Sequence, residues 1–184
     1  IIEILTAIRE AVGDHFVVGV RTSMDHLMPI GDGLNLDEAK AIVTALSSSG
    51  LADYISMITG SFYSIYNLVP PMAIPPGFTI SQAREIRTVC TVQMIVTGRI
   101  RTPEQAATLI TEGVTDMVGM ARSFIADPEW VVKAQRGEGH RIRPCISCNQ
   151  GCWGMIAKGR YGSCILNPEA GNERQLGVIL RRSR

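Results

Sequence analysis

Residues 92–104 read VQMIVTGRIRTPE, and this stretch contains the alternation that decides the fold. The apolar run Val92–Ile100 predicts a strand that leads straight into a turn at Gly98. Thr102, Pro103 and Glu104 then supply an N-cap, a proline at the first helical position and an acid in the first turn. The stretch is therefore expected to form one strand–turn–helix unit of an α/β protein.

Similar units lie on both sides of this one. Further strands are expected at His15–Ser23 and Ala52–Gly60, and Val114–Phe124 is expected to form a strand with its exit turn. The continuous apolar run of the first favours burial on both of its faces. Helices are expected at Ile1–Val12, from Asn35 to Gly50, from Ser81 to Val89, from Thr102 to Gly113 and from Asp127 to Gly137. This alternation with short connections predicts parallel strands joined by right-handed crossovers.

Two architectures fit four such units: an open doubly wound sheet, or part of a (β/α)8 TIM barrel. No G-x-G-x-x-G follows a predicted strand, so the dinucleotide fingerprint of the open fold is missing. The last two strands end in the turns TGR and MAR. Because turns after the last strands of a TIM barrel commonly bind phosphate, the pattern favours the barrel.

The longest connection, Ser61–Phe78, contains four prolines and is expected to be irregular. Tyr63 and Tyr66 lie in it, on the rim where a barrel has its active site. Either hydroxyl is a candidate to donate a proton, and packing within the loop is the alternative role. The catalytic acid or base is otherwise unknown.

Composition limits the class of protein. The 184 residues include 18 basic and 17 acidic side chains, a balance that favours neither nucleic acid nor an anionic membrane as partner. No signal peptide is visible, and the five cysteines do not resemble a secreted disulfide framework, so a cytoplasmic location is expected. The sequence also lacks an initiator methionine, which predicts that it is part of a longer protein.

Four of the five cysteines lie in residues 141–173. Cys145, Cys148, Cys152 and Cys164 have the spacing C-x2-C-x3-C-x11-C, with glycines between them that let the backbone fold back. Three close cysteines and one distant one form a typical ligand set for a [4Fe–4S] cluster. A structural zinc ion and disulfides remain alternatives. Cys90, at the end of a predicted helix, is expected to be a small buried hydrophobe.

Three arginines stand at predicted strand exits: Arg21, Arg99 and Arg122. In a parallel barrel these positions face one rim, where arginines can hold an anion through two hydrogen bonds. Separate salt bridges to loop carboxylates explain the same pattern equally well. Gly98 adds backbone access for a phosphate. The three histidines form no metal-ligand or triad pattern.

Four motifs together resemble a known family: VGVRTS (Val18–Ser23), VTGRI (Val96–Ile100), DMVGMARSFIADPEW (Asp116–Trp130) and the cysteine motif within Arg143–Glu173. They are similar to the iron–sulfur flavoenzymes of the Old Yellow Enzyme superfamily, the branch of 2,4-dienoyl-CoA reductase and trimethylamine dehydrogenase. The resemblance covers nearly the whole chain. It implies the second half of an FMN-binding (β/α)8 barrel over residues 1–140, a [4Fe–4S] segment at 141–173 and a linker at 174–184.

The resemblance also implies roles for individual residues. Arg21 would lie at the pyrimidine edge of FMN, and Gly98, Arg99, Ala121 and Arg122 would hold its phosphate. Cys145, Cys148, Cys152 and Cys164 would be the cluster ligands. The missing first half-barrel, with further FMN contacts, and the FAD- and NAD(P)H-binding domains would be supplied in the same chain or by a partner.

The activity implied is that of a flavin-dependent oxidoreductase. A hydride would move between FMN and a small-molecule substrate, either an activated alkene or an N-methylated amine. Electrons would pass through the cluster to a second flavin and NAD(P)H. One departure is that the reductases of this branch carry a catalytic histidine after the strand at Ala52–Gly60, whereas this sequence has none between His26 and His140.

Two other interpretations stay open. One is a non-catalytic half-barrel that binds phosphate, holds a structural zinc and forms a homo-oligomer. The other is an electron-transfer subunit that pairs with a separate chain.

Overall fold

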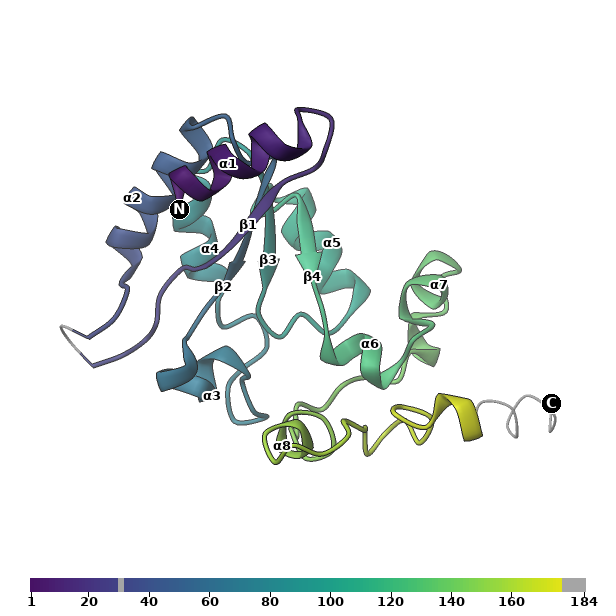
Figure 1. Ribbon diagram of the computed structural model, residues 1–184. Helices are drawn as coiled ribbons and strands as arrows, with labels where there is room; N and C mark the ends of the chain where they lie inside the picture. The colour runs from purple at the N-terminus through teal and green to yellow at the C-terminus, as the bar shows by residue number, and fades with distance from the viewer. Residues whose placement is uncertain (30–31, 177–184) are drawn as a thin grey trace.

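Four parallel strands form one sheet and follow each other in the order β1-β2-β3-β4 (Figure 1). The computed structural model describes residues 1–29 and 32–176. The strands are β1 (Gly19–Ser23), β2 (Tyr54–Ile58), β3 (Gln93–Thr97) and β4 (Met117–Gly119). A doubly wound sheet reverses its strand order at a switch point, and this sheet does not. The sequential order is that of a (β/α)8 barrel, which confirms the predicted fold class.

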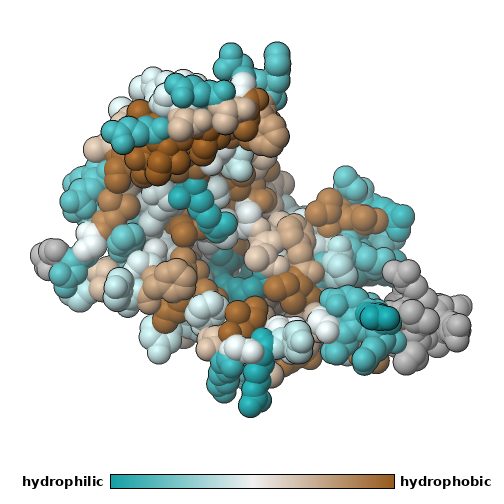
Figure 2. All heavy atoms as spheres, viewed as in Figure 1, coloured by the Kyte–Doolittle hydropathy of each residue, from teal (hydrophilic) through white to brown (hydrophobic). Residues whose placement is uncertain are grey.

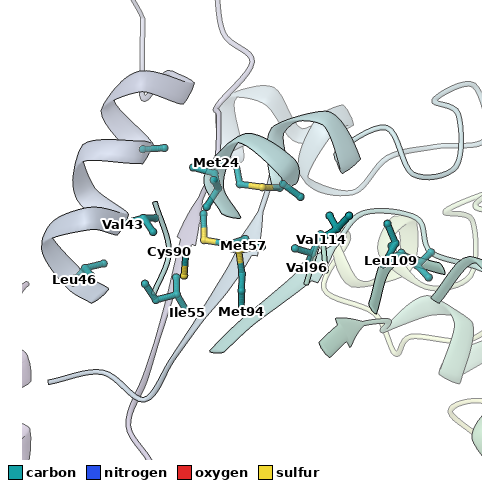
Figure 3. Packing of buried hydrophobic residues seen from close by; sticks show 14 of the residues in the cluster. Met24, Val43, Leu46, Ile55, Met57, Cys90, Met94, Val96, Leu109 and Val114 are labelled. Carbon is teal, nitrogen blue, oxygen red and sulfur yellow. The ribbon is translucent and has the colours of Figure 1, made fainter. Parts of the chain in front are cut away.

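The core lies between the sheet and the helices that connect its strands (Figure 3). Ile55 and Met57 of β2, with Met94 and Val96 of β3, point to the buried face. They meet side chains from α2 (Leu36–Ser48), α4 (Ile80–Arg87) and α5 (Pro103–Thr111). The alternate residues on these strands are only partly covered, because helices pack on one face of the sheet.

The first strand is shorter than predicted. β1 begins at Gly19, and Phe16 and Val17 precede it with 63% and 68% of their surface exposed. Gly19 and Arg21 are exposed within the strand, so the prediction of burial on both faces was wrong. An apolar run predicts only a tendency to be buried, and the covering elements decide which faces are buried.

Two predicted helix starts are confirmed in detail. Asn35 caps α2, since its Oδ1 accepts from the Glu38 N–H at 3.0 Å while Glu38 Oε2 accepts from the Asn35 N–H at 3.1 Å. Thr102 caps α5 by accepting from the Gln105 N–H at 3.2 Å, with Pro103 at the first helical position.

The first helix, α1 (Ile2–Val12), ends at Gly13, whose φ of 75° suits glycine. Its apolar stripe is mostly uncovered, because only Leu5 is buried while Ile4 keeps 64% of its surface exposed. Figure 2 shows hydrophobic side chains gathered over this helix. The remaining exposed members of the stripe and of the segment that follows it are Ile1, Ile8, Val12, Phe16 and Val17.

The proline-rich connection is more regular than predicted. A 3-10 turn, η1 (Phe62–Ser64), and a single helical turn, α3 (Ile65–Leu68), follow β2. Ser61 begins this structure because its hydroxyl accepts from the Tyr63 and Ser64 N–H groups. These two turns precede all four prolines of the connection. The number of prolines therefore did not predict the structure of its first half.

The C-terminal third consists of short elements, of which α7 (Trp130–Gln135) lies beside the sheet and α8 (Trp153–Ile156) lies below the strand exits (Figure 1). The others are α6 (Arg122–Ala126) and η2 (Gly139–Arg141). The strand and exit turn predicted at Val114–Phe124 correspond to β4 and the start of α6. Of the predicted linker at 174–184, residues 177–184 lie outside the described residues. Among the described helices, none is both long enough and apolar enough to cross a membrane.

Candidate functional site

A cavity of about 250 Å³ opens at the C-terminal ends of the four strands. The residues that the sequence placed at strand exits surround it: Arg21, Gly98, Arg99, Ala121 and Arg122. Cys145, Ser147, Cys152, Trp153 and Ile156 close it from the cysteine segment. Residues far apart in the sequence thus meet at one rim, as parallel strands require.

The arginines at the strand exits line this cavity without a carboxylate partner among the described residues. In the part of the chain that the structure describes, Arg21, Arg99 and Arg122 form no ion pair with a carboxylate, in contrast to the salt-bridge alternative. Arg122 Nη1 instead donates to the Pro70 carbonyl oxygen and to Asn149 Oδ1, each at 2.7 Å. Neutral acceptors fix a guanidinium and leave its charge available for an anion.

Arg99 is buried, and its backbone has a φ of 53° in the left-handed region. Burial lowers the pKa of Arg99, and the positive charges of Arg101 and Arg122 lower it further, whereas Cys145 opposes this shift. A guanidinium stays protonated at any physiological pH. Crowded cations that remain charged are stabilised when an anion binds among them.

Three buried polar atoms lack a hydrogen-bond partner within residues 1–29 and 32–176: Thr59 Oγ1, Thr79 Oγ1 and Arg101 Nε. All three residues line the cavity. Buried polar groups are nearly always paired, so these three atoms are exceptions, and each of them is shielded behind the cavity wall in this conformation. Arg101 is a site residue that our sequence analysis missed, although it follows Arg99 by two positions in the same turn.

Two glycines at the exits of β3 and β4 pack closely against threonine side chains. A Cβ atom on Gly98 would lie 1.8 Å from Thr79 Oγ1, and one on Gly119 would lie 2.2 Å from Thr97 Oγ1. Both glycines line the cavity, and Gly98 is buried. Only glycine fits these two positions without moving a threonine, so the close packing at the strand exits requires it.

The four clustered cysteines line a second cavity, together with Arg122, Ile125, Gly151 and neighbouring residues. All five cysteines are free, so the disulfide alternative is not realised in this conformation of the described chain. No three His, Cys, Asp or Glu side chains among the described residues converge closely enough to hold one metal ion. A single tetrahedral zinc ion needs thiolates about 4 Å apart, a spacing that follows from the Zn–S bond length.

The two cavities share a wall. Cys145, Cys152, Arg122 and Ile125 line both of them. The Ser147 N–H donates to Cys145 Sγ at 3.3 Å, so the backbone of this turn already directs a hydrogen bond at a candidate ligand. Cys90 lies elsewhere, buried in the core as predicted, and burial raises the pKa of its thiol.

Comparison with known proteins shows the family to which the chain belongs. The family model described as the NADH:flavin oxidoreductase / NADH oxidase family matches residues 1–140. The chain belongs to this family.

Among curated relatives of this family member, a metal reductase from Desulforamulus reducens is 37% identical over 177 residues, covering 96% of this chain and 26% of the relative. An N,N-dimethylglycine/sarcosine dehydrogenase from Chromohalobacter salexigens is 33% identical, covering 94% of this chain and 25% of the relative. The chain thus spans about a quarter of the length of these relatives.

The solved structure of a 2-naphthoyl-CoA reductase with 2-naphthoyl-CoA has a similar fold. Its TM-score is 0.87 at 27% sequence identity, over 95% of this chain and 26% of that one. The agreement extends beyond the residues matched by the family model, so it includes most of the cysteine segment.

The two tyrosines of this flavin oxidoreductase family member do not enter the cavity. Tyr63 and Tyr66 lie on η1 and α3 with 90% and 72% of their surface exposed, and neither lines the cavity. Neighbouring residues of the same connection, from Asn67 to Pro70, do line it. The sequence therefore predicted the correct connection, and the structure brings a different part of it to the cavity.

Proposed function

We propose that this chain forms the FMN- and [4Fe–4S]-binding part of a flavin-dependent oxidoreductase. A hydride would move between FMN and a small-molecule substrate, and electrons would pass through the cluster to a second flavin and NAD(P)H. The observation that carries this proposal is the wall shared by the arginine-lined cavity and the four-cysteine cavity. Residues 1–140 would form the half-barrel and residues 141–173 the cluster segment.

FMN would occupy the first cavity. Its phosphate requires cations, which Arg99 and Arg122 supply, and Gly98 and Ala121 line the cavity beside them. When bound, FMN supplies the hydride chemistry. Arg21 would place positive charge at the pyrimidine edge of the ring and so stabilise an anionic reduced form.

A [4Fe–4S] cluster would be held at the second cavity. Cys145, Cys148, Cys152 and Cys164 all line this cavity as free thiols, and four thiolates are the ligand set that a cubane needs. The cluster supplies one-electron transfer when bound. The N–H group of Ser147 would keep its hydrogen bond to the Cys145 sulfur, and such bonds tune cluster potentials.

Other residues of the chain exclude water and orient groups. Trp153 and Ile156 of α8 cover the cavity from the cysteine segment. Apolar cover lowers the local dielectric and strengthens the action of the arginines on any bound anion. The proton donor or acceptor for the substrate would come from elsewhere, or from Tyr63 or Tyr66 after the connection has moved.

Two substrate classes are proposed. The similar N,N-dimethylglycine/sarcosine dehydrogenase is named for N-methylated amines, and the similar 2-naphthoyl-CoA reductase for a conjugated acyl-CoA. Both reactions move a hydride to or from carbon, so one arginine-lined flavin site can serve either. The parts that the relatives have beyond this chain would provide the other half of the barrel and the nucleotide-binding domains, in the same chain or in a partner.

The proposal is tested by the metal and flavin content of the chain purified without oxygen. We expect about four irons and four acid-labile sulfides per chain, as a cubane on four thiolates requires. Cys148→Ser should remove this iron, whereas Cys90→Ser, in the core, should retain it. One zinc without sulfide would contradict the proposal and favour the structural-zinc alternative.

The flavin half of the proposal is tested separately by fluorescence titration of FMN. Arg99→Gln and Arg122→Gln should each weaken FMN binding about tenfold or more, the value of a charge-assisted hydrogen bond. Arg136→Gln, at an exposed position outside both cavities, is the control and should bind like the unaltered chain. Equal affinities in all four proteins would place the flavin elsewhere.

A further inference from the structure

Two hydrogen bonds connect the cavity arginines to the turn that carries the first three clustered cysteines. Arg99 Nε donates to Ser147 Oγ at 3.1 Å, and Arg122 Nη1 donates to Asn149 Oδ1 at 2.7 Å. Ser147 and Asn149 flank Cys148 on either side. Arg99 and Arg122 therefore each hold one neighbour of the same cysteine.

The backbone conformation of this turn depends on such contacts. Four non-glycine residues in the described ranges have positive φ, and three of them belong to these pairs: Arg99 at 53°, Ser147 at 57° and Asn149 at 58°. L-residues adopt this left-handed region at a cost in conformational free energy, and they keep it where surrounding contacts stabilise it. The side chains of Ser147 and Asn149 make those contacts.

The same network reaches the connection after β2. Asn149 Nδ2 donates to the Val69 carbonyl oxygen at 2.8 Å, and Arg122 donates to the adjacent Pro70 carbonyl oxygen at 2.7 Å. Asn149 thereby joins the β4 exit, the Val69–Pro70 segment and the cysteine turn. Every acceptor in this set is neutral, so the arginines are positioned while their charge is kept.

We propose that Ser147 and Asn149 are positioning residues that couple anion binding at Arg99 and Arg122 to the conformation of the Cys145–Cys152 turn. This inference rests on the proposed phosphate site. A phosphate bound to Arg99 and Arg122 fixes their side chains in the orientation in which they contact Ser147 and Asn149. In turn, the ordered cysteine turn fixes both arginines in the orientation that binds phosphate. Coupling of this kind is reciprocal by thermodynamic necessity.

The experiment uses the metal-free chain and inorganic phosphate, with ionic strength held constant by chloride. The alkylation rates of Cys145 and Cys148 by iodoacetamide are followed by mass spectrometry, and phosphate affinity by calorimetry. Phosphate should slow alkylation of both cysteines about fivefold or more, the lower end of typical coupling. Cys164, outside the turn, is the internal reference.

Variants separate the coupling from a general effect on folding. Ser147→Ala with Asn149→Ala should weaken phosphate binding about tenfold and remove its effect on alkylation. Gln150→Ala, an exposed neighbour in the same turn, should behave like the unaltered chain.

The outcomes distinguish this inference from the proposed function. Phosphate that binds with equal affinity to the unaltered chain and the double variant, and leaves alkylation unchanged in both, overturns the coupling while the phosphate site survives. If the unaltered chain does not bind phosphate at all, the anion site fails and the coupling fails with it.

Discussion

Asp127 is an almost fully buried carboxylate that joins the half-barrel to the cysteine segment. Its Oδ2 accepts from Lys133 Nζ at 2.7 Å and from the Arg143 N–H at 2.8 Å. The sequence predicted that Asp127 begins a helix, and α7 begins three residues later at Trp130, after a turn in which Asp127 Oδ1 accepts from the Glu129 N–H at 3.1 Å. One carboxylate oxygen thus serves the local turn, while the other is satisfied by Lys133 and the Arg143 N–H.

Replacement of this carboxylate should be costly. Asp127→Asn leaves Lys133 without its buried partner, and we expect the free energy of unfolding to fall by about 3 kcal/mol at pH 7. Urea unfolding followed by circular dichroism measures this loss. Asp14→Asn, at an exposed carboxylate, is the control and should change stability little.

The same residue predicts a dependence on pH. Burial alone would raise the pKa of Asp127, but hydrogen bonds from Lys133 and the Arg143 N–H outweigh it and lower the pKa below its usual value of 3.8. A lowered pKa stabilises the fold above the pKa of the unfolded state, and this contribution is lost as pH falls through the folded value. The stability difference between the unaltered chain and Asp127→Asn should therefore shrink below about pH 4. A constant difference down to pH 2 would contradict this.

Helix starts are the elements that the sequence specified most completely. At α2 the N-cap, the reciprocal bond from Glu38 and the apolar face all lie within 14 residues of chain, 35–48. Such local pairs form whenever the helix forms, so they are readable without tertiary information. The strands differ, because β1 and β4 acquire their limits only from pairing with β2 and β3.

The cap of α2 can be tested by substitution. Asn35→Ala should lower the free energy of unfolding by about 1 kcal/mol, because the Glu38 N–H loses its acceptor. Asn35→Gly should cost only a few tenths of that amount on the same scale, since glycine leaves the N–H open to water. Thermal and urea unfolding of the two variants provide the comparison, and equal losses would argue that the side-chain bond is not the cause.

At the scale of the whole molecule, an apolar band over α1 remains uncovered (Figure 2). Exposed apolar patches of this kind promote association. We expect Ile4→Gln together with Ile8→Gln to reduce concentration-dependent association of the chain, measured by sedimentation velocity. Thermal stability should stay nearly unchanged, because both side chains are exposed.

Leu5 provides the matched control for that prediction. It lies between the two substituted positions, but its side chain is buried in the core. Leu5→Gln should therefore destabilise the fold by about 2 kcal/mol or more, since it buries an amide without an evident partner. If Ile4→Gln with Ile8→Gln destabilised the chain as much as Leu5→Gln, the band would be part of the core instead.

The sequence by itself determined the four strand–helix units, two helix caps, the glycine turn at Gly98 and the residues that approach one rim. These features depend on neighbours in the chain or on the general geometry of parallel strands, and both can be inferred from periodicity and spacing. Membership of the family added the flavin chemistry.

Only the tertiary structure decided which side chains meet. Arg99 and Ser147 are 48 residues apart, and Arg122 and Asn149 are 27 apart, yet their hydrogen bonds join the strand exits to the cysteine turn. Tyr63 and Tyr66 were placed on the correct connection but point to solvent. No local propensity encodes such pairs, because they form only when packing brings the segments together and burial makes an unpaired polar group costly.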